Sequence, residues 1–161
     1  MSDDLVPKVR FNHVALSMPR ASLDDLARAE IADFYGHVFG MSEMPKDPSG
    51  QMDVGDAFVL RAADFEQFLY LIPADDPMSC GGDEHAGVSA PTKEMLLEMY
   101  RRARERAETD HRVDVEELEE IDFGPVRLSS FYVRFLLPLK LEVQHYAVDP
   151  EVADFFYDRA T

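Results

Sequence analysis

Apolar and polar residues alternate near the start of the chain in the pattern of a β-strand. Over residues 9–18 every second side chain falls on the same face of such a strand. One face carries Phe11, His13, Ala15 and Ser17, and the other carries Asn12, Val14, Leu16 and Met18. Pro19 ends the predicted strand, because proline has no backbone N–H to donate within a sheet.

A helix is predicted after this strand. Its apolar residues recur at the three- and four-residue spacing that places them on one face, and Gly40 follows as a typical helix end. These residues are Ile31, Phe34, Tyr35, Val38 and Phe39. We place the N-cap at Ser22, with Asp25 three residues later in a near-match to a capping box. Residues 41–55 are predicted to be irregular, with room for a short edge strand, and residues 57–61 and 67–73 to form a hairpin.

The same order of elements then occurs a second time. Residues 75–82, which contain Pro77 and the pair Gly81-Gly82, are predicted to connect two halves. The second half has a predicted strand at 84–90, a helix capped by Thr92, strands at 115–123, 128–137 and 139–146, and a short terminal helix from Pro150. Two such half-sheets can pair edge to edge and enclose a concave cavity, with the helices covering the outside.

Composition and charge narrow the classes of partner. The chain has 161 residues, of which 46% are apolar, so it can form a core without disulfides or metals. Its net charge of −16 repels phosphate backbones and anionic lipid heads, which argues against a nucleic acid or a membrane as partner. The acidic N-terminus does not resemble a signal peptide, and the single cysteine, Cys80, cannot form an internal disulfide. We therefore expect a cytoplasmic protein.

Two histidines occupy corresponding places in the two halves. His13 lies in the first strand of the first half, and His85 lies 72 positions later (85 − 13) in the first strand of the second half. Strand alternation places Ala15 and Ser17 beside His13, and Gly87 and Ser89 beside His85. These small neighbours would leave room for a ligand or substrate next to each imidazole.

A carboxylate in the last strand is the third candidate. Glu142 lies between Leu141 and Val143 and shares a face with Gln144 and Tyr146. An unpaired buried carboxylate would cost several kcal/mol, so a partner is expected. A metal ion would supply it, and so would an arginine, for which Arg127 and Arg134 are the candidates.

Several stretches of the chain resemble the glyoxalase/bleomycin-resistance/dioxygenase family, also called the vicinal-oxygen-chelate superfamily. They are Phe11-Asn-His-Val-Ala-Leu16, the helix end Phe34-Tyr-Gly-His-Val-Phe-Gly-Met41, His85-Ala-Gly-Val-Ser89 and Leu141-Glu-Val143. The resemblance covers nearly the whole chain in order. It implies an α+β fold with two βαβββ modules that form a curved mixed sheet around a central cavity, with helices outside. One domain, 1–161, would comprise module one at about 8–74, a connector at 75–82, module two at about 83–147 and a tail helix at 150–161.

The resemblance also implies a metal site. Its ligands would be His13, His85 and Glu142, with Tyr70 at the remaining position, where relatives commonly have Glu or Gln. Two histidines and one carboxylate are typical of non-haem Fe(II) oxygenases, so Fe(II) is favoured over Zn, Ni or Mn. The implied function is a dioxygenase-like, lyase or isomerase reaction on a small substrate with vicinal oxygens. Glu142 and Tyr70 would be catalytic, Gln144 and Tyr146 would bind substrate, and a homodimer would complete the cavity.

A metal-free protein that binds a small molecule, such as a drug, is the alternative. It is favoured by the missing fourth ligand and by aromatic residues that could stack on a flat ligand. These residues are Phe65, Phe68, Tyr70, Phe131, Tyr132 and Phe135. We interpret His37, His111, His145 and Cys80 as structural or solvated residues.

Overall fold

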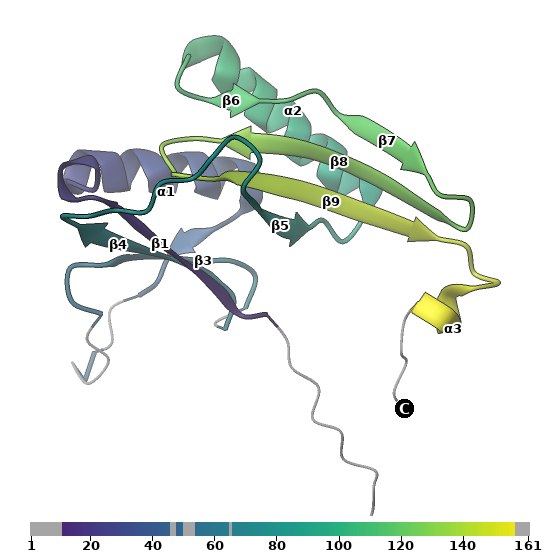
Figure 1. Cartoon of the computed structure of the whole chain (residues 1–161), viewed down its shortest axis with the longest axis horizontal. Helices are drawn as coiled ribbons and strands as arrows, with labels where there is room; N and C mark the ends of the chain where they lie inside the picture. Colours follow the sequence, from purple (N-terminus) through teal and green to yellow (C-terminus); the bar gives the residue numbers. More distant parts are fainter. Residues whose placement is uncertain (1–10, 46–47, 50–53, 65, 157–161) are drawn as a thin grey trace, which may run out of the picture.

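Helix α1 covers one face of a four-stranded sheet in module one. The computed structural model describes residues 11–45, 48–49, 54–64 and 66–156. Within the first sheet the order is β1-β4-β3-β2, with β1 and β4 parallel and the other neighbours antiparallel (Figure 1). In chain order the elements are β1 (His13–Pro19), the 3-10 helix η1 (Arg20–Ser22), α1 (Asp25–Phe39), β2 (Ser42–Glu43), β3 (Phe58–Arg61) and β4 (Phe68–Ala74).

Module two repeats this arrangement with one additional short strand. Its sheet has the order β5-β9-β8-β6, with β7 also paired to β8. The parallel pair is now β5 with β9. The elements are β5 (His85–Ser89), α2 (Lys93–Thr109), β6 (Asp114–Val115), β7 (Glu119–Asp122), β8 (Val126–Arg134) and β9 (Lys140–Val148). The predicted α+β fold with two βαβββ modules is therefore confirmed.

The helix ends follow local capping chemistry. Thr92 caps α2 as predicted, because its side chain accepts a hydrogen bond from the backbone N–H of Met95. Gly40 ends α1 with a positive φ of 70°, a conformation that glycine adopts without steric cost. The predicted N-cap at Ser22 is wrong. Ser22 belongs to η1, and Asp24 caps α1 by accepting from the N–H of Ala27.

The predicted strand at 115–123 is divided by a β-bulge. Val115 pairs with Val133 and Glu119 pairs with Ser130, so four steps along one strand (119 − 115) face three steps along the other (133 − 130). The extra residue separates β6 from β7 and changes which side chains face the core. Helix α3 (Ala153–Phe156) begins three residues after the predicted start of the tail helix at Pro150, and residues 157–161 of that prediction lie outside the described residues.

One hydrophobic core holds the two modules together. It contains the helix-facing residues of both sheets, for example Leu16 and Leu71 from the first and Leu141 and Val143 from the second, all with 1% exposure or less. Helices α1 and α2 contact each other, and their polar sides are joined by an ion pair between Arg106 and Asp33. Among the described strands no hydrogen-bonded ladder joins the two sheets, so the predicted single curved sheet is two sheets that share a core.

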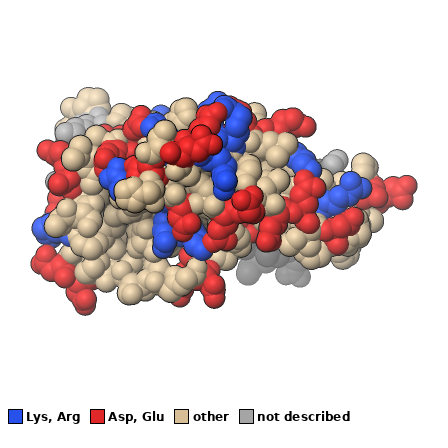
Figure 2. Space-filling model, turned by 90° about the horizontal axis from the view of Figure 1, so that it is seen from above, with Lys and Arg blue, Asp and Glu red and all other residues tan. Residues whose placement is uncertain are grey.

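The surface is acidic but mixed. Figure 2 shows red acidic side chains spread over one face of the molecule among blue basic and tan neutral ones. The described helices include none that has the length and apolar character needed to cross a bilayer.

Candidate metal-binding face

Each sheet has one face packed under its helix and one face turned away from it. Leu141 and Val143 of β9 are fully buried in the core, so Glu142 and Gln144 point to the other side. We call this side the Glu142 face. Its residues are His85, Gly87 and Ser89 in β5, Lys140, Glu142, Gln144 and Tyr146 in β9, and Leu128, Ser130, Tyr132 and Arg134 in β8.

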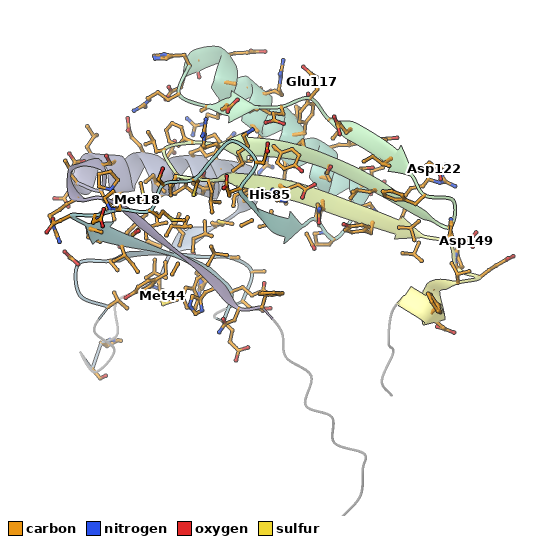
Figure 3. The ribbon with its side chains drawn as sticks, in the orientation of Figure 1. Met18, Met44, His85, Glu117, Asp122 and Asp149 are labelled. Carbon is orange, nitrogen blue, oxygen red and sulfur yellow. The ribbon has the colours of Figure 1, made fainter. Side chains whose placement is uncertain are left out.

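The structure brings His85 and Glu142 together on this face. The Nε2 atom of His85 lies 3.3 Å from Oε2 of Glu142, although the residues are far apart in sequence. The carboxylate side chain is 10% exposed and the imidazole side chain 39% exposed, so ligands from solvent can reach the histidine side of the pair. His85 lies at the start of β5, where it borders β9 (Figure 3).

The other ring nitrogen of His85 identifies the tautomer. Nδ1 lies 2.8 Å from the backbone carbonyl oxygen of Asp83, and a carbonyl can only accept a hydrogen bond. Nδ1 therefore carries a proton, and in the neutral imidazole Nε2 is the unprotonated ring nitrogen, which lies beside an oxygen of Glu142. Two acceptors at this distance repel each other unless a proton or a cation lies between them. A backbone carbonyl that fixes the ring in this way is a common partner of metal-binding histidines.

The donor set fits a divalent metal ion. A nitrogen and an oxygen that each lie about 2.1 Å from one ion are roughly 3.0 Å apart in octahedral coordination and roughly 3.4 Å apart in tetrahedral coordination. The 3.3 Å separation of His85 Nε2 and Glu142 Oε2 lies between these two values. The predicted arginine partner of Glu142 is not observed, because Arg134 donates instead to Asp114 at 3.3 Å and Arg127 lies opposite Ala147 in the sheet.

Tyr132 is a site residue that the sequence analysis did not assign to the metal. It lies directly opposite Glu142 in the sheet, and its ring meets the His85 ring edge to face at 5.3 Å between centroids. Burial raises the pKa of the Tyr132 phenol, and the charge of Glu142 and a hydrogen bond to that carboxylate raise it further. Alternation along the predicted strand 128–137 places Tyr132 on the same face as Ser130 and Arg134. Only the pairing of β8 with β9 places Tyr132 beside Glu142.

Small residues leave space in front of the carboxylate. Gly87 is the residue of β5 opposite Glu142, and Ser89 is opposite Gln144. A Cβ atom built on Gly87 would have the Gln144 side-chain oxygen at 3.7 Å as its nearest neighbour. The predicted substrate residues Gln144 and Tyr146 do share the face with Glu142, and Tyr146 is 42% exposed.

His13 lies on the other sheet and does not join this pair. Its ring stacks on Phe68 at 4.9 Å between centroids, and Nδ1 lies 2.8 Å from the side-chain oxygen of Asn12. Tyr70 shares this face, but its hydroxyl donates to the backbone carbonyl of Val54 at 3.3 Å. In the described part of one chain, no group of three His, Cys, Asp or Glu side chains is arranged to hold a metal ion. One chain therefore assembles two of the three predicted ligands.

His145 and two of the predicted stacking residues do not face Glu142. His145 lies on the face opposite Glu142, as predicted, and its Nδ1 contacts the carbonyl oxygen of Ala90 at 3.2 Å. Phe131 and Phe135 are in the core, with 0% and 3% exposure, so they cannot stack on a ligand. Phe65, named in the same aromatic set, lies outside the described residues.

Comparisons with known proteins give the fold but no close relative. No family model matches the sequence, and no curated protein matches it. A structure described as a possible glyoxalase from Bacillus cereus is 19% identical and superposes with a TM-score of 0.56, covering 86% of this chain and 100% of its own. Lactoylglutathione lyase from Agrobacterium tumefaciens is 24% identical, with a TM-score of 0.53 and coverage of 86% and 94%. A glyoxalase/bleomycin resistance protein/dioxygenase from Alicyclobacillus acidocaldarius is 20% identical, with a TM-score of 0.53 and coverage of 83% and 89%. The chain therefore has the fold of these glyoxalase/bleomycin resistance/dioxygenase structures.

Proposed function

We propose that this chain, which has the glyoxalase/bleomycin resistance/dioxygenase fold, is a metal-dependent enzyme that acts on a small substrate with two neighbouring oxygens. The observation that carries the proposal is the pair His85 and Glu142, in which an imidazole held by the Asp83 carbonyl places Nε2 3.3 Å from a carboxylate oxygen. A cation between these atoms would remove their repulsion. A divalent ion there would supply Lewis-acid stabilisation of negative charge that develops on the substrate oxygens.

The third ligand comes from a second copy of the chain in this proposal. His13 is exposed on the corresponding strand of the other module, and His85 and Glu142 have no third ligand in the described part of their own chain. A two-fold homodimer in which module one of each copy faces module two of the other would give two identical sites. Each site would then have two histidines and one carboxylate, the set that favours Fe(II) and a dioxygenase-like reaction.

The residues around the pair have separate roles in this scheme. Tyr132 lies opposite Glu142 in the sheet and would hold the orientation of the carboxylate by donating its phenolic hydrogen to it. Gly87 and Ser89 leave space for the substrate, and Gln144 can hydrogen-bond to one of its oxygens. Tyr70, predicted as catalytic, accompanies His13 on its sheet and would enter the site from the second copy.

Metal content tests the proposal directly. The untagged protein is purified anaerobically and analysed for iron, zinc, nickel and manganese, beside Glu142→Ala, His85→Ala and the control His111→Ala, whose histidine is an exposed loop residue. We expect near-stoichiometric metal in the wild type and the control, and its loss in the other two. Iron would direct the substrate search to catechols and O₂ uptake, and zinc or nickel to lyase or isomerase reactions.

A wild type that takes up no metal, even after soaking with these ions, would contradict the proposal. The second candidate function, a metal-free binder of a small flat molecule, would then apply. The observation that favours this candidate is the aromatic pair on the other sheet, where Phe68 stacks on His13 with an interplanar angle of 3°. Small aromatic molecules titrated into the metal-free protein would identify such binding.

A further inference from the structure

Arg61 lies in the same row of side chains as His13. Phe68 of β4 is the register partner of His13 on one side and of Arg61 on the other, so the three side chains share one face of the first sheet. We call this the His13 face. Phe58 and Leu60 on the same strand as Arg61 are core residues, which confirms that Arg61 points away from helix α1.

The guanidinium of Arg61 is incompletely satisfied. Its Nε atom is buried without a hydrogen-bond partner, and it is the one such side-chain atom in the described part of the chain. The other end of the group makes a long contact, from Nη2 to the Ser42 hydroxyl at 3.4 Å. A buried N–H without a partner costs free energy, so a native structure that retains one usually has an ion, a water or a ligand to satisfy it.

Arg61 also differs from most arginines of this acidic chain. Seven other described arginines form ion pairs with carboxylates of the chain: Arg20, Arg101, Arg102, Arg104, Arg106, Arg112 and Arg134. No carboxylate of the described residues pairs with Arg61, although acidic residues outnumber basic ones by 32 to 16 in the sequence. A guanidinium that pairs with no carboxylate of the described residues, on the same face as a candidate metal ligand, is available to an anion from solution.

We infer that Arg61 binds a carboxylate group of the substrate. This inference rests on the proposed function, because it assigns to one substrate both the vicinal oxygens at the metal and an anionic group at Arg61. The planar fork of arginine matches a carboxylate through two parallel hydrogen bonds, which the two terminal nitrogens of the guanidinium would donate. The substrate class is therefore a compound with vicinal oxygens that also carries a carboxylate.

The spacing within the row suits a substrate with one ring between the two groups. Neighbouring strands are about 4.8 Å apart, so the backbones at His13 and Arg61 are separated by roughly 10 Å. Phe68 lies between them and presents an apolar surface to the middle of the ligand. All three residues belong to module one. Their spacing is therefore the same whether module one faces module two of its own chain or module two of a second copy.

Paired ligands that differ only in the carboxylate test the inference. The zinc-loaded full-length protein is titrated calorimetrically with catechol and with 3,4-dihydroxybenzoate at neutral pH, where zinc binds without redox turnover. The variants are Arg61→Met, Arg61→Lys and the control Arg104→Met, which removes a positive charge from an exposed part of α2. We expect 3,4-dihydroxybenzoate to bind roughly ten- to a hundredfold more tightly than catechol in the wild type and the control. This preference should disappear in Arg61→Met and be reduced in Arg61→Lys, which retains the charge but not the fork.

The possible results separate this inference from the proposed function. Equal binding of the two ligands to the wild type, or a preference that persists in Arg61→Met, would overturn the carboxylate site and leave the metal site intact. Failure of both ligands to bind zinc-loaded protein would overturn the proposed function and this inference with it. A thermal unfolding midpoint that does not fall in Arg61→Met would support a ligand-binding role, whereas a lower midpoint would indicate that Arg61 stabilises the fold.

Discussion

The hydroxyl of Tyr35 in helix α1 donates a hydrogen bond to the backbone carbonyl of Phe135, at 3.1 Å, across one hundred positions of the chain. The same hydroxyl accepts a hydrogen bond from the N–H of Phe135 at 3.3 Å. Tyr35 is fully buried, and burial raises the pKa of its phenol well above the ordinary value. Leu136, next to Phe135, has a positive φ of 57°, so Tyr35 satisfies the backbone of a strained turn in the other module.

Replacement of Tyr35 by phenylalanine should therefore destabilise the protein. The change leaves the N–H and the carbonyl of Phe135 buried without a partner, and we expect the free energy of unfolding to fall by about 1–3 kcal/mol. Chemical denaturation measures the difference. Tyr100→Phe is the matched control, because the Tyr100 hydroxyl donates to the exposed carboxylate of Glu117, and its effect should be within about 0.5 kcal/mol. Equal effects of the two changes would contradict the importance of the buried hydrogen bonds.

Mixed dimers test whether two chains share a metal site. His13→Ala and His85→Ala should each lose metal and activity, because every site of either homodimer lacks one ligand. In a mixed dimer one site lacks both histidines and the other has both, so a statistical mixture of chains should recover about a quarter of the wild-type sites. Metal content after co-refolding of the two variants measures the recovery. Mixed dimers that form but remain without metal would show that the ligands do not come from two chains.

The Tyr132 phenol should ionise at a higher pH than an ordinary tyrosine. Burial raises its pKa, and the charge of Glu142 raises it further. In Glu142→Gln the pKa of Tyr132 should fall but remain above the usual range, because the burial persists. Ultraviolet titration of each metal-free protein against its Tyr132→Phe counterpart isolates this tyrosine. Glu117→Gln is the control, and it should leave the pKa of Tyr132 unchanged, because Glu117 pairs with Tyr100 instead. A Tyr132 titration that is the same in Glu142→Gln would mean that the two groups do not interact.

Ion pairs on helix α2 should make stability depend on acid pH. Hydrogen bonds from Arg101 and Arg102 lower the pKa of Glu98 from 4.5 to about 2. A carboxylate with a lowered pKa in the folded state stabilises the protein above its unfolded pKa, and this contribution is lost as the pH falls toward the folded pKa. The wild type should therefore exceed Glu98→Gln in urea midpoint by a constant amount above about pH 5, and the difference should close between about pH 4.5 and 2. A difference that persists at the lowest pH would contradict the role of the charged pair.

Much of the fold follows from local patterns that the sequence contains. Alternation placed His13, His85 and Glu142 on the faces where the structure has them, because successive side chains of a strand point to opposite sides. The three-and-four spacing of apolar residues predicted α1 and α2 for a similar reason. The start of α1 was predicted wrongly, since both Ser22 and Asp24 can cap a helix and only the turn after Pro19 decided between them.

Contacts between strands depended on tertiary structure. Tyr132 lies opposite Glu142 only because of the register between β8 and β9, and Arg61 lies in one row with His13 only because of the registers of β1 and β3 against β4. The sequence by itself determined which residues share a face, because that depends on neighbours two positions apart. The tertiary structure decided which faces and rows meet, because their meeting depends on packing between residues many positions apart. This packing pairs His85 with Glu142 and leaves His13 on a different sheet.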